Sequence, residues 1–112
     1  MKVVYIAGPF TAKTPWEIRQ NINRAEEVAF EVAEAGFMPL CPHTNTGNFI
    51  GTKTSKFWYE GTLELMRRCD AVLVLPGYKN SVGTRSEINE AARIGLPVFL
   101  NINDLALWAI DE

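Results

Sequence analysis

The chain has 112 residues, of which 47% are hydrophobic and 21% are charged, and its formal net charge is -2. These values indicate one globular domain spanning residues 1–112, with room for a single core and no second domain. The balanced charge and a pI near 5.4 differ from the basic surface of proteins that bind polymeric nucleic acids, so no such partner is expected.

The N-terminal residues and the cysteines bear on location and cofactors. Residues 3–7 form a short apolar run that ends in a Gly-Pro pair, which is too brief for a signal peptide or a membrane span. We therefore expect a cytoplasmic protein with no membrane partner. Cys41 and Cys69 lie far apart and each adjoins an apolar run, as is typical of reduced, buried thiols. The single His43 cannot complete a zinc site, so no metal is expected.

Strand-like and helix-like segments alternate along the chain, which is typical of a parallel sheet with helices on both faces. Residues 3–7 are a continuous apolar run, as expected of a buried parallel strand. Apolar side chains recur at helical spacing from Trp16 to about Ala35, and Gly36 is expected to end this helix. A second strand is predicted at residues 37–41.

The middle of the chain contains a long polar segment between two periodic ones. Residues 42–55 are rich in Thr, Asn and Gly and show little periodicity. A compact domain usually keeps such a segment for a functional reason, so we interpret it as an active-site loop. A helix is predicted at residues 57–68 and a third strand at residues 70–75.

The last third of the chain completes the alternation. A helix is predicted at residues 83–94, closed by Gly95, followed by a fourth strand at residues 97–100. Asn103 or Asp104 is expected to cap a short last helix. The prediction is a single flavodoxin-like or Rossmann-like α/β domain with a parallel sheet of four to five strands. Its strand order is expected to be 2-1-3-4, with right-handed crossovers.

The C-terminal residues 105–110, Leu-Ala-Leu-Trp-Ala-Ile, are apolar enough to seek a neighbour. We expect a homo-oligomer on this ground. The alternative is that the segment only packs on its own sheet, because exposed apolar residues are common. A further hypothesis is an interaction protein that uses Trp108 and its neighbours as a docking face.

The residues 81–87, Ser-Val-Gly-Thr-Arg-Ser-Glu, follow the third predicted strand and lead into a helix. In an open α/β sheet, ligands bind outside the carboxyl ends of the strands, so Glu87 is a candidate for chemistry. The same pattern has a structural interpretation. Thr84-x-x-Glu87 is also a capping box, in which the Glu side chain reaches back to a free N–H of the helix start.

Three motifs in chain order carry a resemblance to a known family. They are Tyr-Ile-Ala-Gly-Pro-Phe at residues 5–10, Cys-Asp-Ala-Val at residues 69–72, and Ser-x-Gly-Thr-x-x-Glu at residues 81–87. In this order and spacing the chain resembles the nucleoside 2-deoxyribosyltransferase superfamily over nearly its whole length. This superfamily includes small phage and bacterial members and a deoxynucleotide 5'-monophosphate N-glycosidase branch, which the chain resembles.

The resemblance implies cleavage of the N-glycosidic bond of a (deoxy)nucleoside 5'-monophosphate or nucleoside, by hydrolysis or base transfer. Glu87 is then the group that attacks or stabilises the anomeric carbon, because the transition state resembles an oxocarbenium ion. Tyr5 would hold this carboxylate, or else it is a core aromatic with a satisfied hydroxyl. The partner is a small nucleotide or nucleoside, and no cofactor is required. The base, the sugar and the acceptor stay open.

The resemblance also bears on the 5' end of the substrate. Superfamily members that use free nucleosides commonly carry an acidic residue six positions before the nucleophile, whereas the nucleotide-hydrolysing branch has Ser, as this chain has at Ser81. A hydroxyl and the N–H groups of a helix start can donate hydrogen bonds to a phosphate. We therefore favour a 5'-monophosphate. An ordinary N-cap is the other interpretation of Ser81.

Other candidates surround the predicted site. A glycine lets backbone approach a ligand and a proline stiffens the turn after strand one. The cations Lys13, Arg19 and Arg24 can meet a phosphate or can be solvated surface charges. Side chains just past strand two can read a base or sugar edge, although a loop His without a role is the other interpretation there. The candidate substrate-binding residues are Gly8, Pro9, Phe10, Arg19, His43, Asn45, Ser81, Gly83 and Thr84.

One departure from the family pattern concerns the leaving base. Family members usually place an Asp eight residues before the Asp that opens the central strand, and here that position is Thr62. A leaving base needs a proton or tight hydrogen bonds, so either Glu60 or Glu64 acts instead, with Glu60 as our candidate, or the base leaves unaided and slowly. In the structural interpretation, Glu60 and Glu64 form a solvent-facing pair at i and i+4. Asp70 is interpreted as structural.

The same departure motivates a different class of function. Without an acid to assist the leaving base, the chain would be a non-catalytic nucleotide-binding module that senses or sequesters a nucleotide. Glu87 argues against it, because a carboxylate in the site of an anionic ligand weakens binding.

Overall fold

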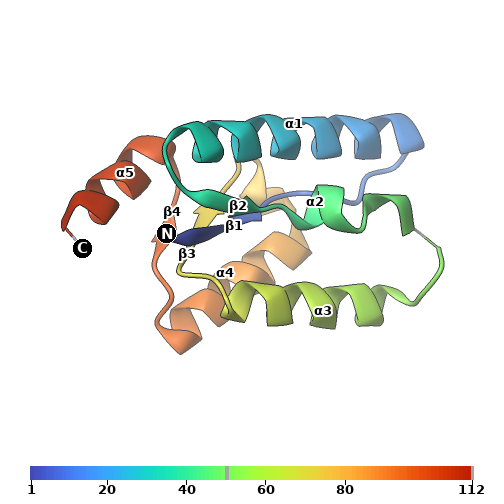
Figure 1. Ribbon diagram of the computed structural model, residues 1–112. Coiled ribbons are helices and arrows are strands. Elements are labelled where there is room, and N and C mark those ends of the chain that lie inside the picture. The colour runs from blue at the N-terminus through green and yellow to red at the C-terminus, as the bar shows by residue number, and fades with distance from the viewer. Residues whose placement is uncertain (50, 112) are drawn as a thin grey trace.

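The computed structural model describes residues 1–49 and 51–111. In these residues, four parallel strands form a sheet between two layers of helices (Figure 1). The strands are β1 (Val3–Ala7), β2 (Met38–Leu40), β3 (Ala71–Val74) and β4 (Val98–Phe99). Their order in the sheet is β2-β1-β3-β4, and every neighbouring pair is parallel. The predicted fold class and strand order are therefore confirmed.

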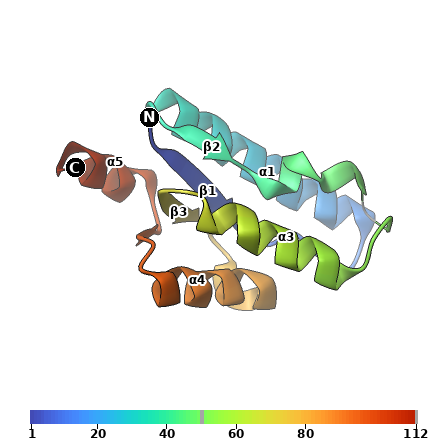
Figure 2. The same ribbon diagram turned by 60° about the horizontal axis from the view of Figure 1, so that its bottom comes forward.

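Helices connect the strands and cover both faces of the sheet. In Figure 1, α1 and α5 lie on one face, and α3 and α4 lie side by side on the other, as Figure 2 also shows. The α-helices are α1 (Pro15–Glu34), α2 (Pro42–Asn45), α3 (Ser55–Arg67), α4 (Val82–Ile94) and α5 (Ile102–Asp111), and the 3-10 helices are η1 (Gly47–Phe49) and η2 (Tyr78–Asn80).

Local signals in the sequence explain where α1 begins and ends. The side chain of Thr14 accepts a hydrogen bond from the Glu17 N–H, and Pro15 occupies the first turn, where its missing N–H leaves no bond unmade. At the other end the chain leaves the helix through Gly36, whose φ of 98° lies in the left-handed region. The predicted stop at Gly36 is confirmed.

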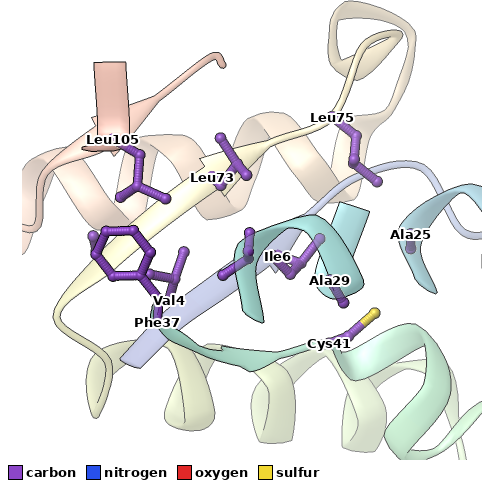
Figure 3. Close-up of a cluster of buried hydrophobic side chains, with 11 residues drawn as sticks. Val4, Ile6, Ala25, Ala29, Phe37, Cys41, Leu73, Leu75 and Leu105 are labelled. Atoms are coloured by element: carbon purple, nitrogen blue, oxygen red, sulfur yellow. The ribbon is translucent and has the colours of Figure 1, made fainter. Parts of the chain in front are cut away.

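The alternation of side chains along β1 divides the core in two. Val4 and Ile6 point to the α1 face, where they pack with residues of α1 and with Leu105 of α5 (Figure 3). Tyr5 and Ala7 point to the opposite face, among residues of the layer formed by α3 and α4. Successive residues of a strand face opposite sides of a sheet, so β1 alone directs Tyr5 towards the helix that carries Glu87.

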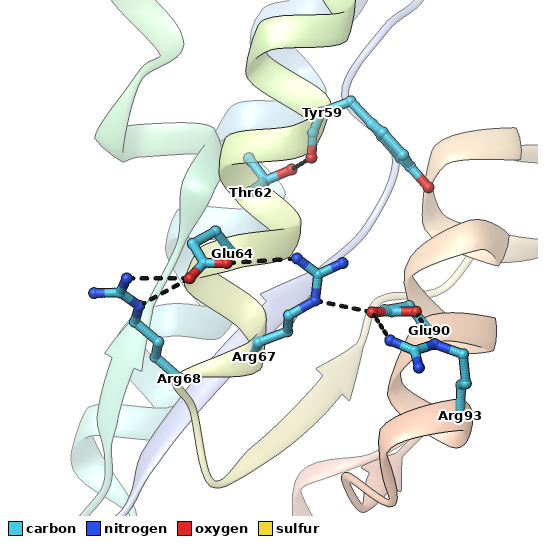
Figure 4. Close-up of polar contacts among 7 residues, drawn as sticks. All are labelled: Tyr59, Thr62, Glu64, Arg67, Arg68, Glu90 and Arg93. Atoms are coloured by element: carbon cyan, nitrogen blue, oxygen red, sulfur yellow. Dashed lines mark hydrogen bonds and ion pairs between the residues drawn. The ribbon is translucent and has the colours of Figure 1, made fainter.

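An ion-pair network joins the two helices of this second layer (Figure 4). Glu90 on α4 accepts hydrogen bonds from Arg67 on α3 at 2.9 Å and from Arg93 at 2.7 Å and 2.8 Å. Arg67 and Arg68 also contact Glu64. Exposed ion pairs each contribute little to stability. The Glu90 side chain, however, is only 14% exposed, and its pair with Arg67 links α4 to α3.

Several predictions need correction. Residues 42–55 were interpreted as an active-site loop because they show little periodicity, but they contain α2 and η1, which are too short to show it. The last helix was expected to be capped by Asn103 or Asp104. Its cap is Asn101 instead, whose side chain accepts from the Asp104 N–H at 2.9 Å.

The structural predictions for the two cysteines and for Asp70 are borne out. Both Cys41 and Cys69 are buried and free. The Asp70 carboxylate accepts from the Val3 N–H at 2.8 Å, which ties the start of β1 to β3. None of the helices in the described part of the chain is long and apolar enough to cross a membrane.

Candidate active site

The site begins with a contact between Tyr5 and Glu87, which are 82 residues apart in sequence. The Tyr5 hydroxyl donates a hydrogen bond to Oε2 of Glu87. Tyr5 is fully buried on β1, and Glu87 is half-buried on the second turn of α4. The other oxygen of the carboxylate, Oε1, makes no hydrogen bond to the described residues, so it is available for chemistry.

Burial changes the acidity of both groups. Burial raises the pKa of Glu87 from 4.5 to about 7, and the hydrogen bond from Tyr5 opposes this shift. Burial, together with the charge of Glu87, raises the pKa of Tyr5 far above its usual value, so the phenol stays protonated. Tyr5 is therefore a permanent donor, and Glu87 changes its charge near neutral pH.

Ser81 and Thr84 define the start of α4. Ser81 is the N-cap, because its hydroxyl accepts from the Thr84 N–H at 3.2 Å and from the Thr84 hydroxyl at 2.8 Å. The capping-box interpretation of Thr84 and Glu87 is therefore wrong: Thr84 is inside the helix, and Glu87 bonds Tyr5. Gly83 lies one turn before Glu87, and a methyl group there would meet no described heavy atom within 4 Å.

The loop after β1 is held by two buried polar side chains. His43 Nε2 lies 2.9 Å from the Pro9 carbonyl oxygen, and Asn21 Nδ2 donates to the Phe10 carbonyl at 3.0 Å. The ring of Phe10 also lies beside His43, with centroids 5.5 Å apart. Burial lowers the pKa of His43, so its ring is neutral at neutral pH and donates through Nε2. His43 therefore has a structural role, and the interpretation of a loop His without one is wrong.

Gly8 has a packing reason to be a glycine. A Cβ at this position would lie 2.4 Å from Cδ1 of Leu75 and 2.8 Å from its Cβ. The close neighbour is thus Leu75, a buried core side chain just after β3. The sequence suggested instead that Gly8 makes room for a ligand.

Thr62 lies at the position where an acid was missing. Its hydroxyl donates to the Tyr59 carbonyl at 3.0 Å (Figure 4), so its one proton is already used within α3. Glu60 is two residues away, which is nearly the opposite side of a helix. It is exposed and lies 3.8 Å from Lys56. Glu60 therefore does not join the pair formed by Tyr5 and Glu87.

Two further candidates, Arg19 and Asn45, have exposed side chains. Arg19 lies on α1, and Asn45 is the last residue of α2. Asn21, which is only 8% exposed, was not predicted as part of the site. The available signal in the sequence was its position four residues before Ala25, on the apolar face of the helix, since a polar residue on such a face needs a partner. No group of three or more metal-binding side chains lies together in residues 1–49 and 51–111.

A solved structure has the same fold. The 2-deoxyribosyltransferase from the psychrotolerant bacterium Bacillus psychrosaccharolyticus aligns with a TM-score of 0.61 and 22% sequence identity. The alignment covers 86% of this chain and 69% of that one. No curated protein sequence matches the chain.

A family model matches residues 2–101, which include all four strands and the helices α1 to α4. The family is described as a domain of unknown function, DUF7768. The chain belongs to this family.

Proposed function

We propose that the protein cleaves the N-glycosidic bond of a (deoxy)nucleoside 5'-monophosphate or nucleoside, with Glu87 as the nucleophile. The observation that carries this proposal is the Tyr5–Glu87 contact on the helix that follows β3. A buried carboxylate whose pKa is raised to about 7 is typical of functional sites. The fold shared with a 2-deoxyribosyltransferase supports the same class of chemistry.

The reaction follows from the two oxygens of Glu87. Tyr5 fixes Oε2, and Oε1 forms a bond to the anomeric carbon while the bond from that carbon to the base nitrogen breaks. The electron pair of the broken bond leaves with the base. Water or a second base then attacks the anomeric carbon, loses a proton, and releases the Glu87 carboxylate, as in retaining glycoside hydrolysis.

The proposed reaction leaves the departing base without a nearby acid. Two causes determine the shifted pKa of Glu87: burial, and the hydrogen bond from Tyr5. No second carboxylate of the described residues contributes. Thr62 supplies a hydroxyl in place of an acid, and Glu60 pairs with Lys56 on the exposed side of α3. We therefore expect substrates whose base leaves with a proton taken from water.

A second candidate function is the non-catalytic nucleotide-binding module, which this lack of an acid favours. It predicts saturable nucleotide binding without release of base. The two candidates differ in what Glu87 does. In the enzyme, its ionised form is required; in the module, its negative charge opposes an anionic ligand.

Release of free base distinguishes the two. Nucleosides and 5'-monophosphates are incubated with the wild type and with Glu87→Gln, with and without an acceptor base, and the products are separated by liquid chromatography. Base release that disappears in Glu87→Gln supports the enzyme, and a new nucleoside or nucleotide formed from the acceptor indicates transfer. Binding without turnover of any substrate contradicts it and favours the module.

Two control variants make the result specific. Glu31→Gln removes an exposed carboxylate of α1 and is expected to keep full activity. Glu60→Gln tests the predicted general acid directly. Because Glu60 is 64% exposed and pairs with Lys56, we expect activity close to that of the wild type.

A further inference from the structure

A hollow of about 480 Å³ opens beside the carboxyl ends of β1 and β3, on the face of the sheet that α1 covers. Its walls include Pro9, which follows β1, and Leu75 and Gly77, which follow β3. β1 leads into α1 on one face, whereas β3 leads into α4 on the other (Figure 1). This divergence is the topological switch point, where ligands of open α/β sheets bind.

The polar side chains of the hollow come from α1. Asn21, Arg24 and Glu27 line it, whereas the hydrogen bond of Glu87 goes to Tyr5. Arg24 Nη2 donates to Asn21 Oδ1 at 2.5 Å. Asn21 is only 8% exposed, and its amide nitrogen is bonded to the Phe10 carbonyl. Both ends of the Asn21 amide are thus fixed, so Asn21 orients the Arg24 guanidinium.

Arg24 has no carboxylate partner in the described part of the chain. Glu27 lies one turn further along α1, yet no ion pair joins the two residues. The guanidinium donates one hydrogen bond to the neutral Asn21 amide. Its positive charge therefore has no ion-pair partner at the hollow among the described residues. A planar guanidinium with free donors matches the oxygens of a phosphate in a bidentate way.

We propose that this hollow binds a phosphate monoester group, with Arg24 as the cation that contacts it and Asn21 as the residue that orients Arg24. The phosphate belongs either to the nucleotide substrate, in which case the assignment rests on the proposed function, or to a separate phosphate ligand. Glu27 lines the same hollow, so its charge opposes the ligand and limits the affinity.

Calorimetric titration with inorganic phosphate at fixed salt tests the site. Arg24→Gln is expected to weaken binding about tenfold or more, because a charge-assisted bond is lost. Glu27→Gln is expected to strengthen binding, because a repelling charge is removed. Arg68→Gln, a control at an exposed arginine on the opposite helical layer, should bind as the wild type does.

Equal binding by the wild type, Arg24→Gln and Arg68→Gln overturns the proposal, and so does the absence of any phosphate binding by the wild type. The source of the phosphate is separated by kinetics. If it is the substrate's own, Arg24→Gln raises KM for 5'-monophosphates and leaves KM for nucleosides unchanged. If it is a separate ligand, phosphate binding falls in Arg24→Gln while both KM values stay unchanged.

The outcomes also separate this site from the proposed function. Phosphate binding that depends on Arg24, in a protein that releases no base, supports the hollow and contradicts the glycosidase. Base release that depends on Glu87, in a protein whose phosphate binding ignores Arg24, supports the glycosidase and contradicts the hollow.

Discussion

The Tyr5–Glu87 pair combines two opposing influences on one carboxylate. Burial disfavours the ionised form of Glu87, and the hydrogen bond from Tyr5 favours it. The result is a group with a pKa of about 7. Such a carboxylate is ionised in a useful fraction at neutral pH and is poorly solvated, which makes it more reactive than an exposed one. Each influence can be altered by a single substitution.

Tyr5→Phe is predicted to shift the pH dependence of activity upwards. The substitution removes the donor that stabilises ionised Glu87, so the pKa of Glu87 rises above about 7. A hydrogen bond to a charged group is worth about 1.5–3 kcal/mol, which corresponds to about one to two pH units. The measurement is kcat/KM for base release as a function of pH.

The wild-type profile should rise through a midpoint near pH 7, where Glu87 ionises. Tyr59→Phe serves as the control, because Tyr59 is 36% exposed and does not bond Glu87. An unchanged midpoint in Tyr5→Phe contradicts a role for the phenol in setting the charge of Glu87.

Glu87→Gln is predicted to stabilise the fold at high pH and to leave it unchanged at low pH. The folded pKa is raised from 4.5 to about 7, so the folded state binds more protons than the unfolded state between these values. The stability of the wild type therefore falls as pH rises from 4.5 to about 7 and is constant beyond. The side-chain amide of the variant does not ionise. The variant therefore does not lose the few kcal/mol of stability that ionising the buried Glu87 costs the wild type.

The measurement is the free energy of unfolding in urea, at a pH below 4.5 and at one well above 7. Glu31→Gln, at an exposed position, should show no such difference between the two pH values. Equal stability of the wild type and Glu87→Gln at high pH would mean that Glu87 is well solvated in the protein.

At the scale of the elements, the first two turns of α4 carry the candidate site. Ser81 caps the helix and Glu87 follows on its second turn. The ion pair between Arg67 and Glu90 joins α4 to α3 (Figure 4). Glu90 lies about one helical turn after Glu87 in the sequence. The register of α4 is thus fixed at both ends of the segment that carries Glu87, by the cap and by the ion pair.

Gly83→Ala is predicted to raise stability and lower activity. A glycine within a helix is less favourable than alanine by about 1 kcal/mol, and a methyl group here meets no described heavy atom within 4 Å. The protein alone therefore gives no reason for glycine. If substrate approaches Glu87 over this turn, the added methyl group occupies its place, and KM rises.

Gly61→Ala is the matched control for this prediction. Gly61 is also a helical glycine, on α3, with no described heavy atom near a Cβ. Both variants should unfold at higher urea concentration, and only Gly83→Ala should lose activity. Full activity of Gly83→Ala would place the substrate away from the start of α4.

The sequence predicted the elements better than the contacts between them. Apolar runs were sufficient to predict β1 and β3, because both are continuous buried strands, and general topology rules for parallel sheets then predicted the strand order. The pattern Thr84-x-x-Glu87 could not distinguish a cap from a catalytic carboxylate, since both use a Glu at that spacing. Tyr5, the partner whose contact with Glu87 excludes the cap, lies 82 residues away. Short segments such as α2, which has four residues, are too short for a helical repeat of apolar residues to be recognised in the sequence.

At the scale of the whole molecule, α5 has one buried face and one exposed face. Leu105 is fully buried against the sheet, and the ring of Trp108 packs on Phe99 with centroids 5.4 Å apart. The alternative that this segment packs on its own sheet is thus correct for one face. Trp108 belongs largely to that buried face, which makes it a poor docking residue for a partner.

The other face of α5 supports the expected homo-oligomer. Leu107 is 61% exposed and Ile110 is 79% exposed, one helical turn apart, and Leu100 just before the helix is 57% exposed. Exposing three large apolar side chains in so short a segment is unfavourable for a monomer, and such patches mark interaction surfaces. We therefore predict that the chain self-associates through this face, with the driving force proportional to the apolar area removed from water.

Sedimentation velocity over a range of protein concentrations tests this last prediction. The wild type should sediment as a species larger than the 12.5 kDa chain, and the double variant Leu107→Lys with Ile110→Lys should sediment as a monomer with unchanged circular dichroism. Lysines at these exposed positions disturb no buried contact, so a loss of association would report the surface itself. A wild type that stays monomeric at every concentration contradicts the prediction and leaves α5 as a cover for the sheet alone.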